Sequence, residues 1–329
     1  MRFAPIVEFA GPLGLYALGR QLTRRHPRIL MYHRFSEQPT PRSVSAAVFE
    51  RQVEHLARKY HPMTLGELAG RLRNGHAVPP HAIVVTVDDG HHDFHDVAWP
   101  ILERHGVPAT LFVTTGFIDG EAWLWPDQVR WLLNRTVSRP KTLDVAGTTV
   151  TDTSTDTLWH RLIDLMLTLT EAGKQAAIRD LAHQLGASIP AVPPREFSSV
   201  SWAQLRQMQT EGLEVGGHTH THPSLTRVPR EQLSVELDHC LRRLTDELGE
   251  RPRPFCYPNG QPADVDPEIR DAVEAAGFTC SVVAYADGGP HDDPFQLRRH
   301  SGADDYAHFR KVVSGVEWFG AYLRQRTAS

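Results

Sequence analysis

The feature that most constrains the fold is a set of short apolar runs with no polar alternation. Residues 82–87 read AIVVTV, and comparable runs occupy 28–32, 109–114, 254–257 and 278–283. A strand with one wet face alternates apolar and polar residues, whereas a continuous β-branched run is typical of a strand buried on both faces. The sequence therefore indicates an α/β fold built on a parallel sheet that helices cover.

Helical patterns lie between these runs, as parallel strands require. Residues 49–60 (FERQVEHLARKY) carry apolar side chains at helical spacing, and five leucines between 233 and 248 form one stripe. Ser201 and Gln204 have the spacing of a capping box, which opens another helix. Repeated strand–helix units leave two architectures open, a barrel or a doubly wound open sheet.

The alternation pauses between about 120 and 200. This stretch contains Trp-rich and Leu-rich helical segments, a Thr- and Asp-rich segment at 148–157 and a Pro-rich exit at 189–194. It holds no cluster of catalytic residue types, so we interpret it as a helical insertion or lid. The predicted organisation is an N-terminal segment, 1–27, followed by one catalytic domain, 28–329, which the insertion interrupts.

Charge and cysteine usage exclude some classes of protein. The chain has 35 basic and 39 acidic side chains, a net charge of −4, so it lacks the basic surface of a nucleic-acid-binding protein. Its three cysteines, Cys240, Cys256 and Cys280, are far apart and form no CxxC. A disulfide framework is therefore not expected, and a reducing compartment is favoured.

The N-terminal segment is fairly apolar, but Glu8 and two prolines interrupt it. It lacks the basic start, long apolar core and cleavage site of a signal peptide, and it is too short to span a bilayer. We therefore expect a cytoplasmic protein. The segment either packs on the domain or makes peripheral contact with the inner face of the cytoplasmic membrane, ending in the basic stretch at 20–25.

Two predicted strand ends carry reactive side chains. Asp88 and Asp89 directly follow the run at 82–87, and HTHTHP at 218–223 follows a short strand at 213–216. In barrels of parallel strands, the residues just past the carboxyl ends line the active site. These two stretches are therefore expected to meet.

A metal ion would explain this combination of residue types. Adjacent carboxylates after a buried strand are costly to keep charged unless something pairs with them, and a divalent cation could pair with one and leave the other as a base. His218 and His222 alone are a weak signal, because a polar loop of surface histidines has the same pattern. One Asp with two His is a ligand set that leaves positions open for water and substrate. Together the two strand ends predict a catalytic metal centre.

These motifs resemble the polysaccharide deacetylases with a NodB-like domain, the family 4 carbohydrate esterases. TVDDG at 86–90 is close to the family's TFDDG, and HTHTHP at 218–223 fits its H-S/T-x-x-H-P. LMYHRF at 30–35 and FCYPNG at 255–260 are similar to the branch associated with membranes and exopolysaccharides. The resemblance covers about 28–300 and implies a distorted (β/α)7-type barrel.

The resemblance also implies a role for each motif residue. Asp88 would be the general base, and Asp89, His218 and His222 would hold a divalent metal, Zn²⁺ first, with Co²⁺ or Ni²⁺ as alternatives. The metal would polarise the acetamide carbonyl while Asp88 takes a proton from the attacking water. The backbone N–H of Tyr257 is predicted to donate to the oxyanion, because the family uses this loop; the alternative is a buried strand tyrosine.

This chain departs from the family in the third motif. In the family it reads R-P-P-Y, and its arginine holds the catalytic aspartate. Aligning FCYPNG on its Pro-x-Gly puts Cys256 at the place of that arginine and Asn259 at the place of the tyrosine, beside the substrate. We hypothesise that Arg299 supplies the missing cation near Asp88. The alternative is a surface arginine at a strand end.

The catalytic acid is not fixed by the resemblance either. The family's late Leu-x-His motif does not match LRRH at 297–300. His33 follows the first predicted strand, which would bring it to the mouth of the barrel, so we prefer it to His300. Either histidine could also be an ordinary polar residue.

The predicted function is removal of N-acetyl groups from amino sugars of a polysaccharide or lipid-linked glycan precursor, in bacterial envelope or exopolysaccharide biosynthesis. The substrate partner is then an N-acetylated saccharide. One alternative is a metal-dependent hydrolase of a non-sugar amide or a cyclic ureide. The other is a non-catalytic, glycan-binding relative. Acetate release that depends on metal would separate these functions.

Overall fold

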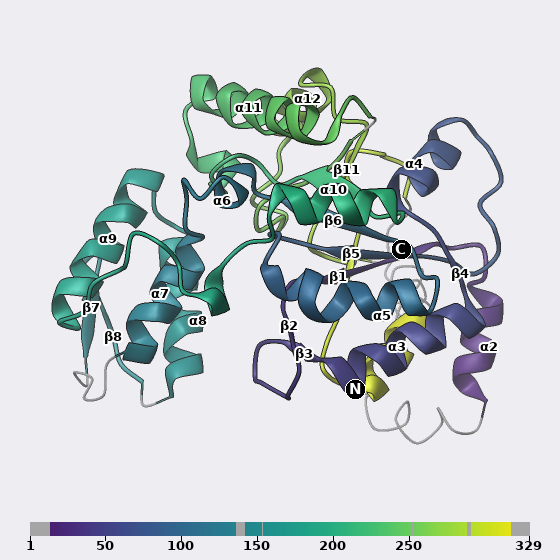
Figure 1. Ribbon diagram of the computed structural model, residues 1–329, viewed down its shortest axis with the longest axis horizontal. Helices are drawn as coiled ribbons and strands as arrows, with labels where there is room; N and C mark the ends of the chain where they lie inside the picture. The colour runs from purple at the N-terminus through teal and green to yellow at the C-terminus, as the bar shows by residue number, and fades with distance from the viewer. Residues whose placement is uncertain (1–13, 136–141, 153, 252, 288–290, 317–329) are drawn as a thin grey trace, which may run out of the picture.

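The computed structural model describes residues 14–135, 142–152, 154–251, 253–287 and 291–316 of the chain. Its centre is a parallel sheet in which seven strands follow the order β11-β10-β9-β6-β5-β1-β12, with β4 added beside β5 (Figure 1). The strands are β1 (Arg28–Tyr32), β4 (His61–Pro62), β5 (Ala82–Val87), β6 (Ala109–Val113), β9 (Glu214–Gly217), β10 (Pro254–Cys256), β11 (Cys280–Val282) and β12 (His300–Ser301).

The segment 297–301 joins the two edges of this sheet. Leu297 pairs in parallel with Val282 of β11, and β12 pairs in parallel with β1. The backbone amide of Val283 donates to the carbonyl of Leu297 at 3.0 Å. The sheet is therefore a distorted barrel, which confirms the fold implied by the motifs and excludes the doubly wound alternative.

The apolar runs of the sequence are the inner strands of this barrel. Every side chain of β1, β5 and β6 is buried, because these strands have neighbours on both edges and covered faces. In Figure 1, α3 and α5 lie below the strands and α10, α11 and α12 lie above them, and all of these helices cover the outside of the barrel. The surrounding helices are α3 (Ala46–Lys59), α4 (Leu65–Arg73), α5 (Trp99–Arg104), α6 (Thr115–Ile118), α10 (Trp202–Thr210), α11 (Arg230–Leu248), α12 (Pro267–Ala275) and α13 (Tyr306–Ser314).

Local signals in the sequence set several helix starts. Ser201 and Gln204 form the predicted capping box at the start of α10. The hydroxyl of Thr64 accepts a hydrogen bond from the amide of Glu67 and so caps α4. After β5 the chain forms a π-helical turn, Phe94–Ala98, which continues into α5.

The insertion between about 120 and 200 has a hydrophobic core of its own. Its buried side chains include Val129, Leu132, Leu162 and Leu181, and they form a cluster separate from the barrel core. Figure 1 shows this unit beside the barrel, connected through α6 and the segment before α10. Its elements are α7 (Trp125–Arg135), β7 (Leu143–Val145), β8 (Thr148–Val150), α8 (Thr155–Met166), α9 (Glu171–Gln184) and the 3-10 turn Arg195–Phe197.

Part of the predicted N-terminal segment is the helix α2, Leu15–Leu22, and residues 1–13 lie outside the described part of the chain. α2 packs on α13, and the approach is close at Gly19, where a Cβ atom would lie 2.8 Å from Val316. Leu18 and Leu22 face outward with more than half of their surface exposed. No helix among the described residues is both long and apolar enough to cross a bilayer.

Candidate active site

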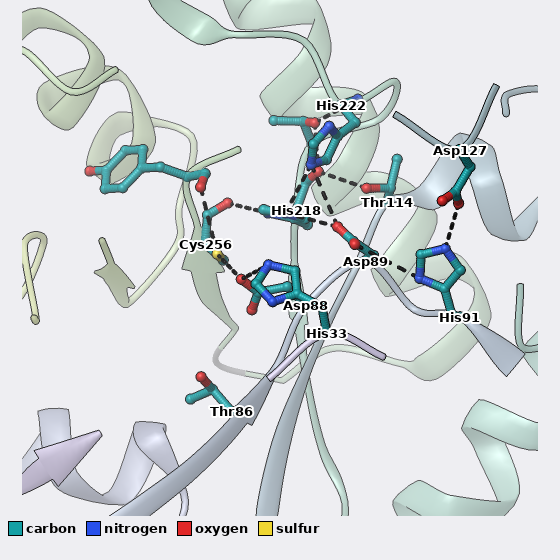
Figure 2. Close-up of polar contacts among 12 residues, drawn as sticks. His33, Thr86, Asp88, Asp89, His91, Thr114, Asp127, His218, His222 and Cys256 are labelled. Atoms are coloured by element: carbon teal, nitrogen blue, oxygen red, sulfur yellow. Dashed lines mark hydrogen bonds and ion pairs between the residues drawn. The ribbon is translucent and has the colours of Figure 1, made fainter. Parts of the chain in front are cut away.

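The end of β5 presents two neighbouring carboxylates in different directions. Successive strand residues point to opposite faces, so a regular strand would place only one of them in the site. Asp89 instead adopts a left-handed conformation with φ 76°, and Gly90 follows with φ 88°. This turn directs Asp88 toward β10 and the closing segment, while Asp89 faces the histidines that follow β9 (Figure 2).

Asp89, His218 and His222 form a compact triangle of donor atoms. Nε2 of His218 lies 3.5 Å from Oδ1 of Asp89, Nε2 of His222 lies 3.6 Å from the same oxygen, and the two Nε2 atoms are 3.2 Å apart. Donors bound at about 2.1 Å to a tetrahedral ion lie about 3.4 Å from one another. The three predicted metal ligands therefore fit one ion of the size of Zn²⁺.

The two histidines differ in protonation. Nδ1 of His218 lies 2.7 Å from the carbonyl oxygen of Cys256, so Nδ1 carries a proton. Burial lowers the pKa of His218, but Cys256 and the hydrogen bond to Asp89 outweigh it and hold that pKa well above its usual value, so a metal at Nε2 would displace the proton shared with Asp89. Burial, followed by the nearby His218, lowers the pKa of His222 to about 3. His222 is therefore neutral at neutral pH, as a metal ligand must be.

The loop that carries the two histidines is fixed by an acidic side chain of α11. The buried carboxylate of Glu236 accepts hydrogen bonds from the amides of His220 and Thr221 at 2.9 and 2.8 Å, and from the Thr221 hydroxyl at 2.6 Å. The amide of His222 donates to the hydroxyl of Thr219 at 3.0 Å. These bonds hold the left-handed conformations of Thr219 and His222 and keep both imidazoles aimed at Asp89.

Asp88 is paired with Arg299 in a fully buried, two-point ion pair. Nη1 and Nη2 of Arg299 donate to Oδ1 and Oδ2 of Asp88 at 2.6 and 2.8 Å. Burial would raise the pKa of Asp88, but the charge and hydrogen bonds of Arg299 outweigh it and hold that pKa below its usual value. The structure thus places Arg299 where the sequence hypothesis required a cation.

Cys256 lies beside this pair and completes a second group of close donors with Asp88 and His218. Its sulfur is 3.1 Å from Nη2 of Arg299 and 3.5 Å from Oδ2 of Asp88. A metal ion bound by this second group would sit against the guanidinium, and the two positive charges would repel each other. The triangle around Asp89 is therefore the better metal site.

His33 lies at the open side of Asp88. Its Nε2 is 3.6 Å from Oδ2 of Asp88, and 47% of its side chain is exposed, against 3% for Asp88. In Figure 2 the imidazole of His33 lies directly in front of the Asp88 carboxylate. The side chain can therefore reach both the base and a substrate that enters from solvent. His300 lies on β12, where it pairs with Leu30 of β1.

Tyr257 and Asn259 follow β10 at the same end of the barrel. The amide of Tyr257 faces the carbonyl of Val282 at 3.4 Å, a long contact that it would have to give up to bind an oxyanion. Its hydroxyl donates to the carbonyl of Phe295 at 3.0 Å, so the ring belongs to the core. Asn259 has φ 61°, and its Nδ2 is buried with no protein acceptor in the described residues.

Three residues of the site carry no prediction from the sequence. His91 lies against Asp89, Asp127 of α7 contacts His91, and Glu236 fixes the histidine loop. His91 could have been suspected from its position two residues after Asp89. Asp127 and Glu236 could not, because each lies on a helix far along the chain and reads as an ordinary polar position.

The sequence of this chain matches a family model and a curated protein. A family model described as polysaccharide deacetylase matches residues 75–281, which is more than half of the chain. Chitin deacetylase 1 of Cryptococcus neoformans var. grubii is 29% identical over 117 residues, 32% of this chain and 24% of that protein. The chain therefore aligns with about a quarter of this curated relative.

Several solved structures share the fold. Deacetylase PplD of Streptococcus pyogenes has a TM-score of 0.57 at 16% identity, covering 84% of this chain and 92% of PplD. IcaB from Ammonifex degensii has a TM-score of 0.56 at 19% identity, covering 88% and 97%. A de-N-acetylase from Aggregatibacter actinomycetemcomitans has a TM-score of 0.53 at 15% identity, covering 86% and 99%. With the family model, the barrel and both motifs in agreement, this chain belongs to the polysaccharide deacetylase family.

Proposed function

We propose that this chain removes N-acetyl groups from amino sugars in a polysaccharide or lipid-linked glycan precursor, with a divalent metal as cofactor. The observation that carries the proposal is the triangle of Asp89, His218 and His222 beside the paired carboxylate of Asp88. Three ligands leave room for water and substrate, and an adjacent base can activate that water. The names of similar proteins, chitin deacetylase and de-N-acetylase, support the class of reaction.

The chemistry is hydrolysis of an amide. When bound, a divalent cation supplies a Lewis acid for the acetamide carbonyl, and Zn²⁺ is the first candidate, with Co²⁺ and Ni²⁺ as alternatives. Asp88 accepts a proton from the water that attacks the carbonyl carbon. Oδ2 of Asp88 accepts from both Arg299 and Cys256, whereas Oδ1 accepts one hydrogen bond from Arg299 and keeps a further lone pair for that proton.

The leaving nitrogen needs a proton when the C–N bond breaks. His33 is our candidate for this acid, because its exposed imidazole lies beside Asp88 at the side open to solvent. The products are acetate and a free amine on the sugar. The buried Nδ2 of Asn259 and the amide of Tyr257 are candidate donors to the carbonyl oxygen or the sugar.

We further propose that the reaction belongs to bacterial envelope or exopolysaccharide biosynthesis and takes place at the inner face of the cytoplasmic membrane. Leu18 and Leu22 are one helical turn apart on the outer face of α2, and Arg24 and Arg25, just after this helix, are also exposed. Apolar side chains beside basic ones favour peripheral binding to anionic lipid. The free, buried state of all three cysteines is compatible with a reducing compartment.

Removal of metal should abolish activity. Treatment with a chelator should stop acetate release from N-acetylglucosamine oligomers or N-acetylated lipid-linked saccharides, and Zn²⁺, Co²⁺ or Ni²⁺ should restore it, because the three ligands have no function without an ion. Release that survives chelation would contradict the metal role. If the enzyme hydrolysed only non-sugar amides or cyclic ureides, its substrates would belong to one of those classes and not to the N-acetylated saccharides. Metal-loaded protein inert toward all these compounds, yet binding the oligomers, would favour the glycan-binding alternative.

Arg299→Ala should lower kcat at least about tenfold with metal still bound, because Asp88 loses the partner that keeps it ionised and oriented. Removal of one partner of a buried ion pair also destabilises a protein by about 3–5 kcal/mol. Circular dichroism must therefore show that the variant is folded before its kcat is compared. Arg299→Lys keeps the charge without the two-point contact and should be intermediate. Arg298→Ala, which removes a salt bridge to Asp287, is the control. A smaller loss in folded Arg299→Ala protein would reject the role.

His33→Ala should remove the basic limb of the pH profile of kcat/KM, because that limb reports loss of the proton from the catalytic acid. The profile is measured from acetate release with Zn²⁺ in excess. His300→Ala is the matched variant, since it is the other candidate from the sequence, and its profile should keep both limbs. The reverse result, with the basic limb lost only in His300→Ala, would exchange the two assignments.

The double substitution Leu18→Glu and Leu22→Glu should weaken binding to vesicles that contain anionic phospholipid by more than about tenfold. Each leucine contributes about 1.5–3 kcal/mol when it leaves water, and the added carboxylates repel the lipid. Co-sedimentation with the vesicles measures the effect. Val235→Glu changes a similarly exposed apolar residue on α11 and serves as control. If the unmodified chain, the double variant and the Val235→Glu variant bound the vesicles equally, α2 would not be the membrane contact.

A further inference from the structure

His91 joins the predicted metal ligand Asp89 to the insertion. It is buried, with 2% of its side chain exposed, and its ring packs edge-on against Phe117. Its Nε2 lies 2.7 Å from Oδ2 of Asp127, the third residue of α7. Its Nδ1 lies 3.8 Å from Oδ2 of Asp89 and has no hydrogen-bond partner among the described residues. Figure 2 shows the imidazole between the two carboxylates.

Asp89 thus uses its two oxygens for different neighbours. Oδ1 faces His218 and His222, while Oδ2 faces His91. A carboxylate that binds a metal through one oxygen is commonly held in orientation by a polar group at the other. His91 is in the position of that group, because its buried Nδ1 faces this oxygen and has no hydrogen-bond partner among the described residues.

The insertion is tied to the same loop by further contacts. The amide of His92 donates to the carbonyl of Ser198 at 3.0 Å, and the amide of Val200 donates to the carbonyl of Gly90 at 2.9 Å. Arg34, next to His33, donates to the carbonyl of Glu196 at 2.6 Å. The exit of the insertion, 196–200, therefore reaches the turn that carries Asp89, and Asp127 near its entry does so through His91.

Arg34 also fixes Asp127 relative to the barrel. Its Nε donates to Asp93 at 2.6 Å, and its Nη1 lies 3.8 Å from Oδ1 of Asp127. Asp127 therefore has one oxygen toward His91 and the other toward Arg34, so its position depends on how α7 docks. A helix that moved away from the barrel would take the partner of His91 with it.

We propose that His91 and Asp127 are positioning residues that hold Asp89 in the orientation needed to bind metal, so that the insertion completes the metal centre. This inference rests on the proposed function and adds a task for the insertion. The competing reading is that the pair only helps the insertion to dock, in which case the affinity for metal would not depend on it.

The test measures the affinity of the full chain for Zn²⁺, by competition with a chromophoric chelator. His91→Phe keeps an aromatic ring against Phe117 but removes both nitrogens, and Asp127→Asn keeps the shape of the carboxylate but removes its charge. Each should weaken Zn²⁺ binding about 10- to 100-fold, the usual effect of losing such a supporting contact. The absorption spectrum of bound Co²⁺ should change in both variants, because Asp89 loses its fixed orientation.

Two controls match these variants. His92→Phe alters the next residue, whose side chain lies 3.9 Å from Asp96. Asp156→Asn alters another acid of the insertion, which pairs with Arg130. Both should bind Zn²⁺ as the unmodified chain does. The double variant His91→Phe with Asp127→Asn should bind no more weakly than His91→Phe alone, because the two residues act in series.

Three results would overturn the inference. In the first, folded His91→Phe and Asp127→Asn proteins bind Zn²⁺ within about twofold of the unmodified chain, well short of the usual effect. In the second, the losses of Zn²⁺ affinity in the single variants add in the double variant. In the third, the unmodified chain binds no Zn²⁺, which would also remove the metal from the proposed function. If His91→Phe does not fold, the Zn²⁺ affinities of Asp127→Asn and its control Asp156→Asn decide the inference. A chain that binds Zn²⁺ through this pair but releases no acetate would reject the proposed reaction alone.

Discussion

The ion pair between Asp88 and Arg299 is the contact on which the rest of the site depends. Asp88 directly follows β5, near the middle of the sheet, whereas Arg299 lies in the segment 297–301 that joins its two edges. Each charge alone would be buried without a partner, which costs several kcal/mol. Closure of the barrel and the ionised state of the base are therefore coupled. The loop after β10 is drawn into the same arrangement, because Cys256 contacts both partners and its carbonyl orients His218.

A single backbone turn gives the two neighbouring aspartates separate tasks. The left-handed conformation of Asp89 costs roughly 1–2 kcal/mol in a non-glycine residue. It turns the second carboxylate away from Arg299 and toward the imidazoles, so one side chain stays with a cation of the protein and the other is available to a metal. The histidine loop is strained in the same way at His222 and is held by Glu236. Local strain at both strand ends is thus supported by surrounding hydrogen bonds.

Much of the fold could be predicted because it depends on local patterns. The continuous β-branched runs predicted parallel strands, and the motifs implied the barrel and placed the four motif side chains at strand ends. Arg299 could be anticipated from a missing charge, because a buried carboxylate needs a cation and the usual position holds Cys256. The contacts of His91, Asp127 and Glu236 could not be predicted, because they depend on how the insertion and α11 dock. That docking is set by tertiary packing, which spacing along the chain does not reveal.

The position of Cys256 restricts how such a site can evolve. Its sulfur occupies the space beside Asp88 that a longer, cationic side chain from β10 would need, and Arg299 already fills the rest. Two guanidinium groups on one carboxylate would repel each other, and none would leave the carboxylate buried alone. Exchange of one arrangement for the other therefore requires substitutions at two positions, one on β10 and one on the closing segment.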